Sequence, residues 1–286
     1  MQKGGKMSSR LNFTTAILIS CAVIQAKTTI SIDKAIEKKL IKTDVVCKGG
    51  LNVDYKIKNQ TDDSIKIIVP AGWRMNSVKE EYQDILVTQE QILALGKQQQ
   101  KTFVIKGFCC EADHAGPSQG LKYEPGKLAE PNLVLVASYL NATKFDENTQ
   151  QYSVWAVSNN KPTANIVGSN DSLTQELRYF VAKVKGEPIP WYTLQKRVKI
   201  NSYGEIQEHP LQLKANVNYY TDKIVYAYFY VIDSLGNKVA NITGQWLQAG
   251  NHEYPVNVNV RSLKKGKYKI VLAAENTQFI NKEFEI

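Results

Sequence analysis

The chain has 286 residues, of which 43% are hydrophobic and 22% are charged, and its formal net charge is +9. The densest basic groups, Lys196-Arg197 and Lys264-Lys265-x-Lys267, are not interleaved with the aromatic residues that nucleic-acid binders use for base stacking. We therefore expect no nucleic-acid partner. The sequence has no His-Glu-x-x-His motif and no Walker loop, so we also expect no enzymatic activity, no cofactor and no metal site.

The first 26 residues have the pattern of an export signal. Three basic residues precede an apolar run that ends at Ala26, and this run is shorter than the roughly 20 residues of a transmembrane helix. The pattern predicts cleavage after Ala26 and a protein that is secreted or held at the outer cell surface. Leu18-Ile19-Ser20-Cys21 also resembles a bacterial lipobox, in which Cys21 would carry a lipid anchor. A buried N-terminal strand or helix is the third interpretation.

The remaining length exceeds what one small core normally fills, which favours two domains. Residues 27–165 predict an α+β domain with β-sandwich-like strands and two or three helices. Apolar and polar residues alternate over residues 51–57, and a turn separates them from an apolar run at 64–69, so we expect a hairpin. Further strands are expected at residues 84–88 and 101–105.

Helices are expected after these strands. Pro131 favours the first turn of one helix, and Asn148 or Thr149 can cap a second. Ser172 can cap a third helix, whose apolar residues recur at spacings of three and four. This helix belongs to a predicted bridge and linker over residues 166–195, and we expect it to pack against one of the domains.

Residues 196–286 predict an all-β domain. Leu211, Leu213, Ala215, Val217 and Tyr219 alternate with polar residues, as in a half-buried strand. Short strands separated by Gly and Asn turns favour an immunoglobulin-like sandwich. The further strands are expected at residues 224–232, 239–246, 254–260, 267–273 and 279–286.

Four segments of this region carry a resemblance: YVIDSLGNKV at residues 230–239, AGNHEY at 249–254, LKKGKYKI at 263–270 and KEFEI at 282–286. They resemble the C-terminal immunoglobulin-like modules of secreted Bacteroidetes-type proteins, including the sorting domains of type IX secretion. The resemblance implies a module that displays, anchors or sorts the protein, with secretion machinery as one partner. The Pro-Asn-Pro-like segment with which sorting domains usually begin is absent from the sequence.

The predicted α+β domain resembles another family. The step Phe108-Cys109, the loop around Pro117 and the motif Gln151-Tyr152-Ser153-Val154-Trp155 resemble the thioester domains of bacterial surface adhesins. In that family the cysteine sulfur condenses with the glutamine side chain, and a lysine amine of a host protein then attacks the acyl group. The resemblance implies that Cys109 is the thiol and Gln151 is the acyl donor. Two features depart from the family pattern: the second thiol at Cys110, and the short intervening segment of about forty residues.

The cysteines also allow two other interpretations. In an oxidising compartment, a disulfide between Cys47 and either Cys109 or Cys110 would join the first strands to a later one. Cys109, Cys110, Asp113 and His114 are metal-ligand types, but adjacent cysteines on a strand point to opposite faces, so this spacing is poor for a metal.

Aromatic residues suggest a binding surface. Trp73, Trp191 and Tyr192 are expected near loops or strand edges, where rings can stack on sugars or anchor a protein, although core positions are an equally simple explanation. The sequence therefore predicts an exported, non-enzymatic adhesion or binding protein whose partner is a protein or glycan at a cell surface. A covalent adhesin with a Cys109–Gln151 thioester and a purely structural, disulfide-stabilised module are the alternatives.

Overall fold

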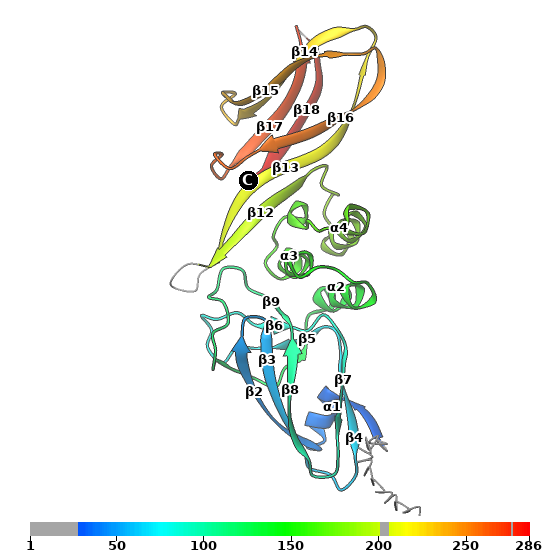
Figure 1. The fold of residues 1–286 in the computed structure, drawn as a ribbon, viewed down its shortest axis with the longest axis vertical. Coiled ribbons are helices and arrows are strands. Elements are labelled where there is room, and N and C mark those ends of the chain that lie inside the picture. Colours follow the sequence, from blue (N-terminus) through cyan, green and yellow to red (C-terminus); the bar gives the residue numbers. More distant parts are fainter. Residues whose placement is uncertain (1–27, 201–205, 276) are drawn as a thin grey trace, which may run out of the picture.

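The structure is a computed structural model that describes residues 28–200, 206–275 and 277–286. The predicted export signal and Cys21 lie outside the described residues. The described chain is β-rich, with strands at both ends of an elongated molecule and helices between them (Figure 1). None of its described helices is long and apolar enough to cross a bilayer.

Three small sheets and a short helix, α1 (Ile32–Glu37), form the N-terminal part. The first sheet has the order β1 (Thr28–Ser31), β4 (Ile65–Val69), β7 (Gln91–Leu95). The second has the order β10 (Lys122–Tyr123), β2 (Ile41–Gly49), β3 (Asn52–Asn59), β8 (Gln100–Lys106). The third has the order β11 (Lys127–Leu128), β5 (Trp73–Met75), β6 (Ile85–Leu86), β9 (Phe108–Cys109).

The prediction that residues 51–57 and 64–69 form a hairpin is wrong, although both segments are strands. The turn between them does form, because the Asn59 side chain donates to the Asp63 carbonyl at 2.8 Å and accepts from the Thr61 amide at 2.9 Å. However, β3 is flanked by β2 and β8, so neither of its edges is open to the next strand. The chain therefore crosses to another sheet, where β4 pairs with β1 and β7.

A helical layer follows the sheets and comprises α2 (Pro131–Ala142), α3 (Glu147–Ser158), the 3-10 turn η1 (Thr163–Asn165) and α4 (Asp171–Lys185). Pro131 occupies the first turn of α2, as expected. The caps of the other two helices differ from the prediction. Asp146 accepts from the Thr149 amide at 2.9 Å, and Asn170 accepts from the Leu173 amide at 3.1 Å. Each helix thus begins earlier than predicted, at the residue whose extended backbone lets its side chain reach the free amides.

The sheets and helices of this part share one hydrophobic cluster. Leu177 and Val181 of α4 are fully buried in it, and α4 also contacts α2 and α3. The predicted bridging helix therefore packs on the N-terminal part of the molecule.

Seven strands form the C-terminal part in two sheets. One sheet has the order β12 (Thr193–Ile200), β13 (Ile206–Thr221), β16 (Gly250–Asn259). The other has the order β15 (Lys238–Leu247), β14 (Val225–Asp233), β17 (Lys267–Ala274), β18 (Thr277–Glu285). Their inward residues form a second hydrophobic cluster, in which the rings of Phe229 and Tyr254 stack at 5.1 Å. The strands expected from alternation are confirmed, and β12 begins at Thr193, inside the predicted linker.

A buried ionic group joins the two parts. Glu208 of β13 lies 3.5 Å from the ammonium of Lys161, which follows α3, and 3.8 Å from that of Lys196 in β12. Val198 of β12 packs against the N-terminal cluster. The strand that leads into the C-terminal part therefore also contacts the helical layer.

Candidate functional site

The free edge of strand β9 faces helix α3. The backbone amide of Cys109 donates to Oε1 of Gln151 at 3.1 Å, and Nε2 of Gln151 donates to the Cys109 carbonyl at 2.8 Å. The opposite edge of β9 pairs with β6, where Cys109 lies across from Ile85. The structure thus brings the Gln151 carboxamide to the backbone of Cys109, the residue with which the sequence motif paired it.

Further contacts hold α3 along the segment that follows β9. The Asn159 side chain at the end of α3 accepts from the Ala112 amide at 2.7 Å, and the Ser158 hydroxyl donates to the Cys110 carbonyl. The Gln151 side chain is therefore one of three that fix this helix against the strand edge. Such multiple anchoring restricts the motion of Gln151 relative to Cys109.

Buried aromatic residues flank Cys109 and Gln151 along the chain. Trp155 follows Gln151 by four residues, so it lies one turn further on the same face of α3. Phe108, Tyr152 and Trp155 are each buried, and the Tyr152 and Trp155 rings meet edge to face at 5.5 Å. These three residues belong to the cluster that also contains Cys109. Cys109 therefore lies in an apolar environment, while Tyr152 also lines a pocket toward the C-terminal strands.

Arg74 of β5 fixes the chain just after the cysteines. Its guanidinium lies 2.8 Å from Asp84, 2.5 Å from Glu111 and 3.1 Å from Glu130. Glu111 also accepts from the Asp84 amide at 2.7 Å. Burial lowers the pKa of Arg74, but the nearby acidic groups Cys110, Glu111 and Asp84 outweigh that effect and raise it overall. The sequence analysis missed this network, because its members lie on separate strands and loops.

The thiols in this site are held in their neutral form. Burial, Glu111 and Cys47 raise the pKa of Cys109 to about 12. Burial and Glu111 also raise the pKa of Cys110 well above its ordinary value, and its side chain is fully buried. Since the thiolate is the reactive form, both Cys109 and Cys110 are weak nucleophiles at neutral pH in the folded chain.

The three described cysteines, Cys47, Cys109 and Cys110, are free thiols in this structure. Cys47 and Cys109 are close enough to interact electrostatically, so a disulfide between them stays a prediction. Within the described ranges, no group of three or more His, Cys, Asp or Glu residues could hold a metal ion. Asp113 and His114 are exposed, whereas Cys109 and Cys110 are buried, so these four residues do not converge.

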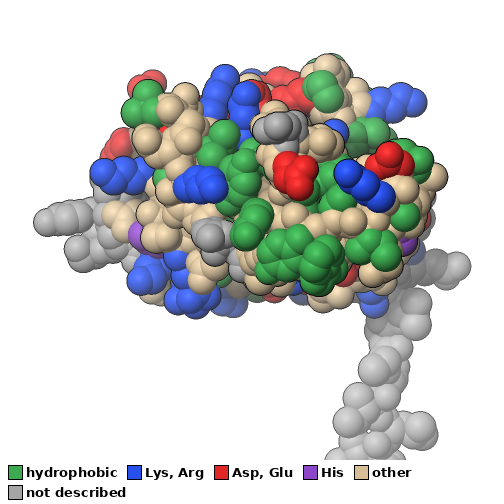
Figure 2. All heavy atoms as spheres, turned by 90° about the horizontal axis from the view of Figure 1, so that it is seen from above, with side chains coloured by type: hydrophobic (Ala, Val, Ile, Leu, Met, Phe, Trp, Pro, Cys, Tyr) green, Lys and Arg blue, Asp and Glu red, His purple; other side chains and the backbone are tan. Residues whose placement is uncertain are grey.

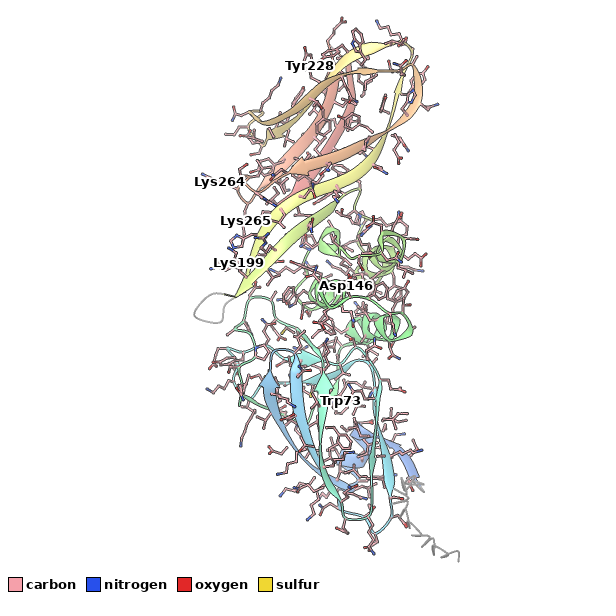
Figure 3. The ribbon with its side chains drawn as sticks, in the orientation of Figure 1. Trp73, Asp146, Lys199, Tyr228, Lys264 and Lys265 are labelled. Carbon is pink, nitrogen blue, oxygen red and sulfur yellow. The ribbon has the colours of Figure 1, made fainter. Side chains whose placement is uncertain are left out.

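The aromatic candidates separate into two groups. Trp73 is only 1% exposed, and its Nε1 donates to the Pro125 carbonyl at 3.0 Å, so its proposed role in surface binding is wrong. Figure 3 shows it within the N-terminal sheets. Its strand, β5, lies inside the third sheet, and the ring packs in the N-terminal hydrophobic cluster. Trp191 and Tyr192 instead line a groove with a volume of about 1020 Å³ between α4 and the C-terminal strands.

Other exposed aromatic residues lie on the outer face of the β14–β15 pair. Trp246 is 66% exposed, and the Tyr226 ring contacts both Trp246 and Tyr228 edge to face. Hydrophobic side chains also gather on the end of the molecule seen in Figure 2.

The sequence contains one further motif, Gly116-Pro117-Ser118-Gln119-Gly120, which has the Gly-x-Ser-x-Gly spacing of a hydrolase nucleophile. In hydrolases this motif forms a sharp turn from a strand into a helix. Here it lies in the loop between β9 and β10, and a strand follows it. This arrangement does not support a nucleophile elbow at Ser118.

No family model matches the chain, and a search of curated proteins found no match either.

Proposed function

We propose that this protein is an exported, non-enzymatic adhesin that attaches to amine-bearing partners through an internal thioester between Cys109 and Gln151. The observation that carries the proposal is the pair of hydrogen bonds between the Gln151 carboxamide and the Cys109 backbone. A thiol and a carboxamide react slowly when free in solution, so their reaction depends on being held together.

The chemistry needs two steps. The Cys109 sulfur attacks the side-chain carbonyl carbon of Gln151, the carbon–nitrogen bond breaks, and ammonia leaves with the thiol proton. A primary amine of the partner then attacks the same carbon, the carbon–sulfur bond breaks, and the amine proton passes to the Cys109 sulfur. The product is an amide between Gln151 and the partner, and neither step needs an oxidant or reductant. Each molecule reacts once, which is binding and not turnover.

The surroundings of Cys109 favour a thioester over a thiolate. Burial raises the thiol pKa because the charged form is poorly solvated, whereas a thioester carries no charge. A leaving thiolate with a high pKa departs slowly, which slows hydrolysis. The buried rings of Phe108 and Trp155 limit the access of water to Cys109.

Gln151 also has a structural explanation. Its carboxamide pairs with the backbone amide and carbonyl at the outer edge of β9, and unpaired backbone groups at a strand edge are unfavourable. The structural explanation predicts an unmodified Gln151, whereas the thioester proposal predicts a covalent bond to Cys109, and this difference can be measured.

We further propose that the two hydrophobic clusters mark two domains and that the C-terminal one is an immunoglobulin-like module. Its seven strands in sheets of three and four support this, because immunoglobulin-like sandwiches divide their strands in the same way. In this proposal the module displays the thioester domain at the cell surface or is read by the secretion machinery. In the same proposal, residues 1–26 direct export of the protein to the outer cell surface or the medium, with or without lipidation of Cys21.

Incorporation of a fluorescent alkylamine tests the proposed function. We expect the purified chain to become covalently labelled, and we expect Cys109→Ala and Gln151→Ala to remain unlabelled. Cys110→Ala is the matched control, because it removes the neighbouring thiol and leaves Cys109 intact. Labelling that persists in Cys109→Ala, or a wild-type chain that takes up no amine, would contradict the proposal.

A further inference from the structure

Two adjoining hollows lie where the helical layer meets the C-terminal strands. The smaller is a pocket of about 260 Å³, and the larger is the groove of about 1020 Å³ that contains Trp191 and Tyr192. Val167, Gly168 and Gln195 line both, so the pocket forms one end of the groove. Asp146, labelled in Figure 3, marks the helical side of this junction.

The pocket contains an unpartnered buried amide. Asn165 at the end of η1 is only 2% exposed, and it lines the pocket. Among the described residues, neither its Nδ2 nor its Oδ1 has a hydrogen-bond partner. Buried polar side chains are nearly always hydrogen-bonded, since an unpartnered one costs about 1–3 kcal/mol. An amide with both a free donor and a free acceptor therefore points to a polar ligand.

Other neutral polar groups line the same pocket. The Tyr152 hydroxyl is buried and faces the Glu208 carboxylate, and burial together with this carboxylate raises its pKa. The side chains of Asn148 from α3 and Gln195 from β12 also line it. These groups can both donate and accept hydrogen bonds.

The two ionic residues of the pocket are already engaged. Asp146 accepts from the Thr149 amide at 2.9 Å, the Thr149 hydroxyl at 2.8 Å and the Ser169 amide at 3.2 Å. Lys196 lies 3.8 Å from Glu208. The groups left free are therefore neutral, which favours an uncharged ligand that is rich in hydroxyl groups.

The groove supplies aromatic surface beside this polar pocket. Tyr179 of α4 is exposed, and it lines the groove with Trp191 and Tyr192. Aromatic rings bind the C–H face of a sugar ring, while amides and hydroxyls bind its hydroxyl groups. The pocket is smaller than the roughly 300–1,000 Å³ of drug-sized sites, so it suits a single sugar ring.

We infer that this junction binds a neutral glycan, with one terminal sugar in the pocket against Asn165 and the following sugars along the groove against Trp191 and Tyr179. This inference goes beyond the proposed thioester and does not depend on it. Such a site would let the protein recognise a glycosylated surface without a covalent bond. It is built from both parts of the molecule.

Saturation-transfer NMR on the full chain tests the inference, with maltotriose, chitotriose and mannotriose as probes. We expect at least one trisaccharide to bind, and we expect Asn165→Leu to weaken its affinity at least tenfold. Because leucine removes an unpartnered amide, we expect the same variant to unfold at a temperature about 2 °C higher than the parent. Weaker binding together with higher stability is the signature of a ligand-binding role, since a structural role would lower stability.

Gln195→Ala is a second variant. Because Gln195 is exposed on β12, the fold should tolerate this substitution, and the loss of the side chain should also weaken glycan binding. Lys199→Ala on the same strand lies outside both hollows and should bind as the parent does. Cys109→Ala should also retain glycan binding, which separates this inference from the thioester. The inference is overturned if no trisaccharide gives saturation transfer, if only a peptide probe binds, or if Gln195→Ala and Asn165→Leu bind like the parent.

Discussion

The side-chain carboxamide of Gln151 forms two hydrogen bonds with the backbone of Cys109, one in each direction. These residues are 42 positions apart, on a helix and on the outer edge of a strand. The contact holds the acyl carbon of one residue beside the residue that bears the thiol. It is the geometric basis of the proposed thioester, and the predictions below separate its chemistry from the structural roles of nearby residues.

Gln151→Glu should remove the covalent activity at a modest cost in stability. A glutamate can accept from the Cys109 amide, but it cannot donate to the Cys109 carbonyl or release ammonia. We expect no amine incorporation and, relative to the chain whose thioester methylamine has opened, a free energy of unfolding lower by about 1–3 kcal/mol. Gln89→Glu is the matched control, because Gln89 also donates to a carbonyl, that of Leu140 at 2.7 Å. Amine labelling that survives in Gln151→Glu would contradict this account.

The three tryptophans Trp73, Trp191 and Trp246 should differ in their contributions to stability. Urea unfolding should show that Trp73→Ala lowers the free energy of unfolding by about 3–5 kcal/mol, because a large buried ring leaves a cavity. Trp246→Ala should change it by less than about 0.5 kcal/mol, because that ring is mostly exposed. Trp191→Ala should lie between them. Equal losses for Trp73→Ala and Trp246→Ala would show that Trp73 is not a core residue.

The free Cys109 thiol should make stability depend on alkaline pH. Its pKa rises from 9.0 to about 12 on folding, so the folded state holds the thiol proton more tightly. The resulting stabilisation is fully present below pH 9.0 and is lost as the pH rises toward 12. We expect the stability difference between the methylamine-treated chain and Cys109→Ala to be constant below that range and to fall within it. A difference that grows with pH would show that the thiol is not buried as described.

Glu208 should stabilise the contact between the two parts of the molecule. Glu208→Gln leaves the largely buried Lys161 and Lys196 without their shared carboxylate, and we expect a loss of about 1 kcal/mol in denaturant unfolding. Glu283→Gln removes a more exposed partner of Lys269, at 3.2 Å, and should have almost no effect. Equal effects of the two substitutions would mean that the Glu208 group contributes nothing beyond a surface pair.

Elements with strong local patterns were predictable from the sequence. Alternation over residues 211–219 identified β13 because every second side chain faces the core, as Leu213 and Val217 do. Pro131 marked the start of α2 for an equally local reason. The short β1 and α1 were missed because four to six residues carry too little periodicity.

Features that depend on long-range packing were not predictable in the same way. The sequence pattern predicted that β3 and β4 are strands, but it could not show that β8, and not β4, pairs with β3. The burial of Trp73 and the unpartnered amide of Asn165 have no local signal, because each depends on segments far away in the sequence. The proximity of Cys109 and Gln151 was suggested only by resemblance to a motif.

The measurement that tests the central claim most directly is the intact mass of the exported protein before and after treatment with methylamine. A thioester predicts a mass below that of the mature sequence by about 17 Da, the mass of ammonia, and a gain of about 31 Da when methylamine opens it. Peptide mapping should place the added amine on Gln151, and thiol alkylation should then find Cys109 newly free. A mass equal to the sequence, or lower by only about 2 Da as for one disulfide, and unchanged by methylamine, would contradict the account.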